Sequence, residues 1–493
     1  MLFDLMAPFM FGGLVVFLLL GYPVAFSLAA NGLLFGLIGI AHGALEPALL
    51  QALPERVLGI MSNSTLLAIP FFTFMGLILE RSGMAEDLLD TVGQLFGKIR
   101  GGVAYAVVFV GALLAATTGV VAASVLAMGL ISLPVMMRYG YSNRLSSGVI
   151  AASGTLAQII PPSLVLIVLA DQMGASVGDF YEGALIPGLT LAVSYGIWVM
   201  IVSIVKPEAA PACPPEARTL FGGALIAKVF TSMIPPLVLI FLVLGTIFLG
   251  VATPTEGGAM GASGAIIMAL AKRKLSFSLL KQAVESTAVM TSFVMFILIG
   301  STVFSLIFRG VNGDLWVEHL LTGVPGGALG FLIVVNVIIF FLAFFLDYFE
   351  IAFIMVPLLT PVAQKLGIDI VWFGVLLAVN MQTSFLHPPF GFALFYLRSV
   401  APKSVKTSDI YWGAVPFVAI QAMMIAVIIA FPGIVTGNIS KATGAITGSG
   451  AEELRRQIEA PRGTSLPSEK GADALPKPDD AGSELERLLK QQK

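Results

Sequence analysis

The sequence contains little charge and almost no cysteine. Charged residues make up 11% of its 493 residues, hydrophobic residues make up 57%, and the mean hydropathy is +0.95. A chain this apolar is not a water-soluble globule, so the composition predicts an integral membrane protein with many crossings. The one cysteine, Cys213, excludes an intrachain disulfide and a cysteine metal cluster.

Basic residues are not in excess either. The chain has 27 Lys and Arg against 29 Asp and Glu, and nine of each lie beyond residue 440. The net charge of −2 by itself says nothing about partners, and for a membrane protein we expect no nucleic-acid partner. The N-terminal run 1–26 has no basic segment and no small-residue cleavage motif, so we interpret it as a retained membrane helix rather than a signal peptide.

Hydrophobic runs of about 20 residues predict helices that cross the membrane. Ten crossings are expected, near residues 5–20, 23–41, 57–79, 145–170, 183–205, 229–250, 254–271, 284–308, 370–397 and 410–431. Two further apolar stretches, 103–137 and 328–364, are each long enough for two short helices and are interrupted by small or polar residues.

Lysine and arginine in short loops predict the orientation of the crossings. The cationic loops, near 81–100, 138–144, 206–228, 272–281 and 398–406, are assigned to the cytoplasm, and the acidic loops at 42–55, 171–182 and 250–256 to the outside. The stretch 103–137 then has cytoplasmic loops at both ends, and 328–364 has outside loops at both ends. Each is predicted to be a re-entrant hairpin.

The sequence contains an internal repeat. Pro134, Gly140 and Pro161 recur as Pro361, Gly367 and Pro388, each pair at one constant offset (361 − 134 = 227). Five crossings and one hairpin in each copy would turn the second copy over in the membrane. We therefore expect an all-α polytopic membrane protein built as an inverted repeat, which is typical of secondary transporters with a site near the bilayer midplane.

The repeat defines the predicted organisation of the chain. We expect a first membrane repeat at 1–205, a cytoplasmic linker at 206–228, a second repeat at 229–432 and a disordered tail at 433–493. The segments 82–98 and 309–324 are amphipathic, precede the two hairpins and are interpreted as interfacial arm helices.

A proline pair interrupts one apolar run in each repeat, near 145–170 and 370–397. Proline removes a backbone donor and keeps the preceding residue out of the helix. The freed backbone groups at membrane depth then need a wet cavity or a ligand. The alternative is a plain proline kink whose hydroxyls bond back to their own helix.

The hairpin tips and breaks supply the candidate binding residues. They are Thr117, Thr118, Gly119 and Ser124 at the first tip, Ser153, Gly154, Thr155, Gln158, Pro161 and Pro162 in the first break, Asp347 at the second tip, and Asn380, Gln382, Thr383, Ser384, His387, Pro388 and Pro389 in the second break. Hydroxyl and carbonyl oxygens suit Na⁺, which we expect near Ser153, Gly154 and Thr155 as the coupling ion, with no other cofactor. Half-helix N-termini suit a carboxylate.

Charges at membrane depth are functional candidates by default. Asp347 and its neighbour Glu350 are such charges, unless the hairpin end reaches the outer interface. His387 is either a proton site or a hydrogen-bonded helix cap, and we favour the cap.

At these residues the sequence resembles the large membrane subunit, a DctM-like permease, of tripartite ATP-independent periplasmic (TRAP) transporters. The runs that carry the resemblance are LLAIPFFTFMGLILERSGMAEDLLD, GALLAATTGVVAASVLAMGLISLPVMMRYGY and GVIAASGTLAQIIPPSLVLIVLADQ, and the likeness covers about residues 1–435. The resemblance implies a Na⁺-coupled, elevator-type importer of organic acids in the bacterial inner membrane. It also implies a small four-helix membrane subunit and a periplasmic substrate-binding protein.

The second break departs from the family pattern. Where the family more often has a threonine before the proline pair and valine-glycine after it, this chain has FLHPPFGFALFY. The aromatic surroundings favour a less polar carboxylate, such as a 2-oxo acid, over sialic acid. A sodium/dicarboxylate symporter that works alone is the alternative function, while an intramembrane enzyme and a channel are disfavoured.

Overall fold

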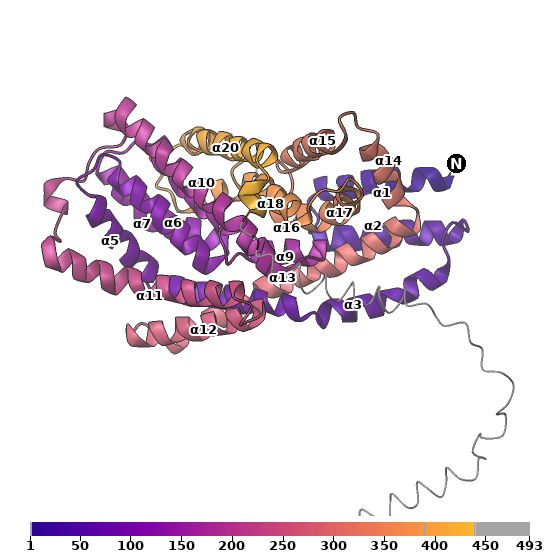
Figure 1. The fold of residues 1–493 in the computed structure, drawn as a ribbon, viewed down its shortest axis with the longest axis horizontal. Helices are drawn as coiled ribbons and strands as arrows, with labels where there is room; N and C mark the ends of the chain where they lie inside the picture. Colours follow the sequence, from indigo (N-terminus) through magenta and orange to yellow (C-terminus); the bar gives the residue numbers. More distant parts are fainter. Residues whose placement is uncertain (1, 389–390, 438, 440–493) are drawn as a thin grey trace, which may run out of the picture. The chain divides into compact units, whose positions relative to one another are not determined.

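The computed structural model describes residues 2–388, 391–437 and 439, and these residues form helices and connecting turns (Figure 1). The α-helices up to residue 205 are α1 (Leu2–Leu19), α2 (Val24–Ala41), α3 (Leu53–Met61), α4 (Ala68–Arg81), α5 (Met84–Phe96), α6 (Gly102–Thr118), α7 (Val121–Arg138), α8 (Asn143–Thr155), α9 (Leu164–Met173) and α10 (Val177–Val205). Short 3-10 helices lie between them at η1 (Pro47–Ala52), η2 (Ser64–Leu67) and η3 (Leu156–Gln158).

The second half repeats this pattern after the turns η4 (Pro207–Ala209) and η5 (Pro215–Ala217). Its helices are α11 (Gly222–Phe248), α12 (Pro254–Ala271), α13 (Phe277–Gly310), α14 (Gly313–Thr322), α15 (Gly327–Leu342), α16 (Tyr348–Ile354), α17 (Val356–Lys365), α18 (Ile370–Met381), η6 (Gln382–Phe385), α19 (Phe392–Val400), α20 (Thr407–Ala430) and α21 (Gly433–Thr436).

The helix bounds recur at the offset seen in the sequence. Helix α7 begins at Val121 and α16 at Tyr348, while α7 ends at Arg138 and α17 at Lys365. Both pairs are 227 residues apart, as are Thr155 and Gln382, which lie at the two helix breaks. The two halves therefore share one order of elements, with a broken helix in each.

Fewer helices qualify as crossings than the ten we predicted. Seven helices in the described part are long and apolar enough to cross a membrane, or eight if a pair of helices bent by 114° counts as one span. Four of the ten do not qualify, and the breaks account for two of them, because they divide these crossings into α8 with α9 and α18 with α19. The other two are the expected crossings 5–20 and 254–271, while α7 qualifies in addition. The expected crossing 57–79 qualifies only from Ser64 onward, because it is interrupted at Asn63, whose side chain accepts a hydrogen bond from the Thr65 N–H and so starts η2.

Three other boundaries differ from the predictions. The first hairpin was expected to hold short helices, but α7 at 18 residues is long enough for a crossing. The linker was expected to reach residue 228, whereas α11 begins at Gly222. The predicted disordered tail was wrong at its start, because 433–436 form α21 with Val435 buried, and from Ser440 onward it lies outside the described residues.

The helices can be described as two sets, which also contact each other, for example α4 with α6 and α13 with α16. In one set α13 packs along α2 (Figure 1), and α12 packs along α4. In the other, α8 packs along α20, α6 and α7, and α18 contacts α9, α10 and α20. Gly148 of α8 allows close contact there, since a Cβ at that position would lie 2.0 Å from the Gly413 carbonyl oxygen of α20.

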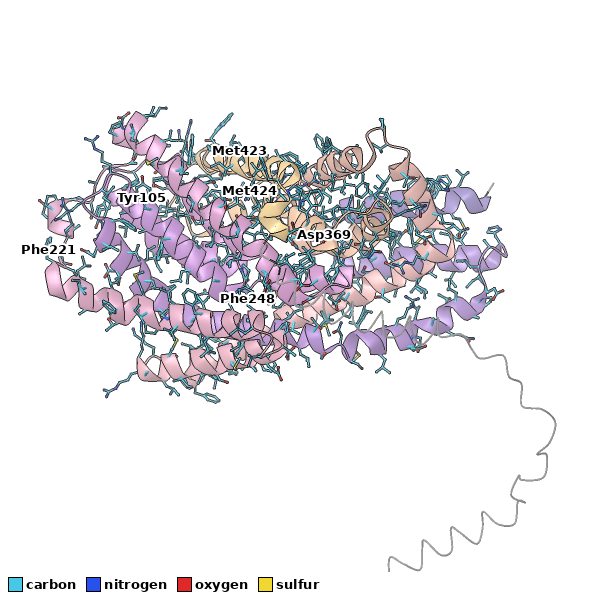
Figure 2. All side chains as sticks on the ribbon, in the orientation of Figure 1. Tyr105, Phe221, Phe248, Asp369, Met423 and Met424 are labelled. Atoms are coloured by element: carbon cyan, nitrogen blue, oxygen red, sulfur yellow. The ribbon has the colours of Figure 1, made fainter. Side chains whose placement is uncertain are left out.

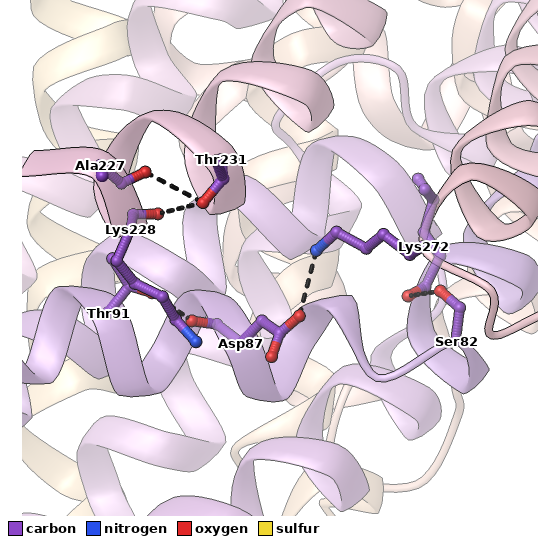
Figure 3. Close-up of polar contacts among 8 residues, drawn as sticks. Ser82, Asp87, Thr91, Ala227, Lys228, Thr231 and Lys272 are labelled. Atoms are coloured by element: carbon purple, nitrogen blue, oxygen red, sulfur yellow. Dashed lines mark hydrogen bonds and ion pairs between the residues drawn. The ribbon is translucent and has the colours of Figure 1, made fainter. Parts of the chain in front are cut away.

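The outward faces of the helices are apolar, as a lipid environment requires. Adjacent residues of α20 show the division: Met423 is 58% exposed and Met424 is 4% exposed (Figure 2). Helices α5 and α12 are joined by an ion pair between Lys272 and Asp87, at 3.1 Å (Figure 3).

Hydrogen bonds group the loops in the way that the charge pattern predicts. On the side assigned to the cytoplasm, the Gly101 N–H donates to the Ala210 carbonyl and the Cys213 N–H to the Gly97 carbonyl. On the side assigned to the outside, the Asn63 amide donates to Asp171 at 2.5 Å. The linker therefore packs against the neighbouring loops that are assigned to the cytoplasm.

Candidate functional site

A cavity of about 420 Å³ lies where the two hairpin tips and the two broken helices meet. Such a volume falls in the usual range for small-molecule sites. Its walls come from four regions: Gly119, Val120, Val121 and Ala122 at the first tip; Gln158, Leu164, Phe385, Phe392 and Tyr396 at the breaks; Asp347, Phe349 and Glu350 at the second tip; and Val289, Met290 and Phe293 on α13. Both sets of helices thus contribute to one cavity.

The tip of the first hairpin is shaped by glycine. Gly119 follows the last residue of α6 with φ of +59°, in the left-handed region that disfavours other residues. A Cβ there would also lie 3.0 Å from Leu164 Cγ. Thr117 and Thr118 end α6, and their side chains lie outside the description. Ser124 is 1% exposed in the first turns of α7.

The two hairpins differ in how their second helix begins. Val120, the N-cap of α7, has no side-chain oxygen with which to cap the helix, so the first-turn N–H groups at the cavity are not capped by their own N-cap residue. Asp347 occupies the equivalent position in the other repeat (347 − 120 = 227) and accepts a hydrogen bond from the Glu350 N–H at 2.8 Å. In return the Glu350 side chain accepts from the Asp347 N–H at 2.9 Å, which completes a capping box.

The cavity is therefore polar at two ends. At one end lies the N-terminus of an 18-residue helix, with its partial positive charge and no cap from the side chain of Val120. Beside it, Gln158 is 3% exposed, and its Oε1 atom has no hydrogen-bond partner among the described residues. At the other end lie the carboxyl groups of Asp347 and Glu350. No Lys, Arg or His is among the residues that line the cavity.

A second polar cluster lies between the two breaks. Gln382 Nε2 donates to Thr155 Oγ1 at 3.0 Å, so two residues at equivalent repeat positions are in direct contact. Thr155 in turn donates to the Ala152 carbonyl at 2.8 Å. Buried oxygens without a partner in the described part of the chain surround this pair, among them Ser153 Oγ, Gln382 Oε1 and Ser384 Oγ.

The first break begins later in the chain than we predicted. Helix α8 continues through Ser153 and Gly154 to Thr155, and the turn that contains Pro161 and Pro162 lies beyond η3. Gly154 is a packing position, because a Cβ there would lie 2.3 Å from Val125 Cγ2 of α7. Gly154 therefore lies in the last turn of α8, and its part in an ion site stays a prediction.

The second break places its polar residues away from the cavity. Asn380 Nδ2 donates to Asn336 Oδ1 at 2.8 Å, and Thr383 donates to the Asn380 carbonyl at 2.7 Å. The His387 ring stacks on Phe344 with centroids 4.3 Å apart. Pro388 is half-buried, and Pro389 lies outside the described residues.

Of the predicted residues, the cavity brings together Gly119, Gln158 and Asp347, with Glu350 beside them. The sequence analysis missed the wall formed by Val289, Met290 and Phe293. No signal in the sequence marked these three, because α13 reads as an ordinary apolar crossing. Ser301 Oγ of α13 donates to the Phe353 carbonyl of α16 at 2.6 Å and so holds this wall against the second tip.

Known proteins resemble this chain along most of its length. The family described as "Tripartite ATP-independent periplasmic transporter, DctM component" matches residues 11–434. A C4-dicarboxylate TRAP transporter large permease protein of Pseudomonas aeruginosa is 31% identical over 72% of this chain and 82% of its own length. The sialic acid TRAP transporter large permease protein of Vibrio cholerae is 28% identical over 84% of this chain and 93% of its own length.

A solved structure has a similar fold. The YdaH transporter of Alcanivorax borkumensis matches with a TM-score of 0.57 at 14% identity, over 79% of this chain and 90% of that one. At this identity the likeness concerns the fold of a membrane transporter alone.

Proposed function

Because the chain belongs to the DctM-component family of tripartite ATP-independent periplasmic transporters, we propose that this large permease subunit imports organic acids and is driven by Na⁺. The protein is a multi-pass protein of the bacterial inner membrane, and its relatives are permeases, not enzymes. The observation that carries the proposal is the cavity between the two hairpin tips, which has a helix N-terminus for a carboxylate and walls from both helix sets.

The coupling ion is assigned to the polar cluster between the breaks. Na⁺ is a hard cation that prefers oxygen ligands, and Ser153 Oγ, Gln382 Oε1 and Ser384 Oγ are buried oxygens that have no partner among the residues the structure describes. Thr155 adds a hydroxyl that already contacts Gln382. Na⁺ near Ser153, Gly154 and Thr155 would satisfy these atoms, with the hydroxyls as ligands and Gly154 as a spacer.

Transport requires that the cavity open to each side in turn. We assign this step to an elevator movement, in which the helices with the breaks and hairpins, α6–α10 and α15–α20, slide against α2, α4, α12 and α13. The cavity supports the assignment, since Val289, Met290 and Phe293 of α13 face a site whose other walls belong to the moving set. The repeated helix bounds support an inverted repeat, in which the two halves exchange roles.

The family implies two protein partners in general, a small membrane subunit and a periplasmic substrate-binding protein. We propose that this chain works with one of each, and that it contacts membrane lipid over its apolar faces. The alternative is a sodium/dicarboxylate symporter that works alone.

Reconstitution tests the proposal. Proteoliposomes with the chain, the small subunit and the binding protein should take up radiolabelled organic acid when Na⁺ is supplied outside, and should stop when any of the three proteins is left out. Robust Na⁺-driven uptake by the chain alone would favour the symporter. No uptake of any organic acid by the complete set would refute the transport function.

A further inference from the structure

Aromatic side chains make up a third of the residues that line the cavity between the hairpin tips. Five of its lining residues are Phe293, Phe349, Phe385, Phe392 and Tyr396. They form two groups: Phe293 and Phe349 meet edge to face with centroids 6.3 Å apart, while Phe392 lies 6.4 Å from Phe385 and 6.5 Å from Tyr396. Aromatic rings in such pairs favour an apolar or aromatic guest that packs against their faces and edges.

The cavity has a place for one anionic group, at the N-terminus of α7. Val120 leaves the N-terminus of α7 without a side-chain cap, and Val121 and Ala122 of its first turn line the cavity. Gln158 supplies the independent observation: its buried side chain lines the same end, and because its Oε1 has no partner in the described part, the amide can turn its NH₂ group, the donor, toward a carboxylate. A carboxylate there would accept hydrogen bonds from the first-turn amides and from the Gln158 amide group.

The opposite end disfavours a second anionic group. Asp347 and Glu350 line it, and no cationic side chain is among the lining residues. A second carboxylate on the ligand would face the two carboxyl groups of Asp347 and Glu350 and no cation, which is costly in a site with little water. A polyhydroxylated acid would also lose hydrogen bonds to water and find few polar partners between the aromatic walls.

We propose that this cavity selects monocarboxylates with an aromatic or branched apolar body, and that it discriminates against C4-dicarboxylates and polyhydroxylated acids. The proposal rests on the carboxylate transport proposed for the same cavity and names its substrate class. The carboxylate lies on the α7 N-terminus beside Gln158, and the apolar body lies between Phe349 and Phe392.

Direct binding tests the class without relying on the binding protein's own selectivity. The full chain in lipid nanodiscs with NaCl is given radiolabelled benzoate, and 4-methyl-2-oxopentanoate, succinate and N-acetylneuraminate are used as competitors. Benzoate should bind and be displaced by 4-methyl-2-oxopentanoate, while succinate and N-acetylneuraminate should need at least about tenfold higher concentrations.

Variants locate the binding in the cavity. Phe349→Ala should weaken benzoate binding by about tenfold, through the apolar contact that it removes. Phe349→Leu, which keeps an apolar side chain, should weaken benzoate binding less. This second variant keeps the test possible if Phe349→Ala does not fold. The control is Phe395→Ala: Phe395 is a phenylalanine of α19 that is 49% exposed and does not line the cavity, so binding should be unchanged.

The outcomes separate the substrate class from the transport function. Tighter binding of succinate than of benzoate, with the same sensitivity to Phe349→Ala, would overturn the class and leave carboxylate transport standing. Equal loss of binding in Phe395→Ala and Phe349→Ala would overturn the location. Absence of binding by every acid would overturn the inference, and if the reconstituted set of three proteins also took up no organic acid, the proposed function would fail with it.

Discussion

A methyl group added at Gly154 should separate α8 from α7. The Cβ of an alanine there would lie 2.3 Å from Val125 Cγ2 and 3.3 Å from the Val125 backbone nitrogen. Val125 is fully buried, so its side chain has no free space into which to turn. Overpacking of this kind typically costs about 1–3 kcal/mol, and we expect Gly154→Ala to lower the free energy of unfolding by that amount.

Thermal unfolding of the purified chain in detergent measures the effect, and two further variants define its cause. Gly196→Ala is the matched control: a Cβ on this α10 glycine would meet nothing within 4 Å, so the variant should be as stable as the parent or up to about 1 kcal/mol more stable. Val125→Ala in the Gly154→Ala background should restore part of the loss, because it makes room for the new methyl group.

The same variants address the ion. If Gly154 acts only as a spacer, the double variant should regain Na⁺ activation of uptake together with stability. A Gly154→Ala protein as stable as the parent, with the control unchanged, would refute the close contact between α7 and α8.

Three further predictions concern single polar groups. Gln382→Leu removes the donor to Thr155 and should lower stability in a thermal unfolding assay by about 0.5–1.5 kcal/mol, and it should raise the Na⁺ concentration for half-maximal uptake. Asp347→Asn keeps a capping side chain on α16, so it should express and unfold like the parent, and a changed Na⁺ activation curve would assign its charge to ion coupling. Burial raises the pKa of Tyr141, in the loop before α8, to about 12. The folded protein keeps the Tyr141 phenol neutral to a higher pH than the unfolded chain does, so the free energy of unfolding is unaffected by this group below pH 10. It falls as the pH rises through 12, by at most about 2.7 kcal/mol. Tyr141→Phe should show no such loss in melting curves between pH 9 and 12.

The repeat and the broken helices could be predicted because both have local patterns in the sequence. Proline pairs and glycines stand at fixed offsets, and the constant spacing from Pro134 to Pro361 reappears in the helix bounds. The capping box of Asp347 and Glu350 is also complete in the sequence, but we interpreted these residues only as charges at membrane depth.

No such sequence pattern indicates the residues that form the walls of the cavity. Phe293 lies on a continuous 34-residue helix whose composition is that of any crossing, and only the tertiary fold brings it to 6.3 Å from Phe349. Gly154 was interpreted as part of an ion site because glycine next to polar residues suggests exposed backbone. In the fold its missing side chain makes room for Val125 of α7, and close packing even between consecutive helices cannot be read from one sequence.

The repeat is also less symmetric than the sequence suggested. Helix α13 is continuous, whereas the equivalent segment of the first half is divided into α3, η2 and α4 at Asn63. The Asn63 amide donates to Asp171 at the end of α9, so this break connects the two helix sets on the side assigned to the outside.

The central claim is that Na⁺ bound among the buried oxygens between the two breaks drives uptake of an organic acid. Initial uptake rates against Na⁺ concentration, in proteoliposomes with the small subunit and the binding protein, measure this most directly for the parent, Ser153→Ala and Thr190→Ala. Ser153 Oγ is buried without a partner among the described residues, while Thr190 is an exposed residue of α10 whose hydroxyl bonds to the Ile186 carbonyl. We predict that Ser153→Ala raises the Na⁺ concentration for half-maximal uptake by about tenfold, as expected for the loss of a hydrogen-bond-sized interaction with a cation, and that Thr190→Ala follows the parent. Uptake that does not depend on Na⁺, or identical curves for Ser153→Ala and the parent, would contradict the account.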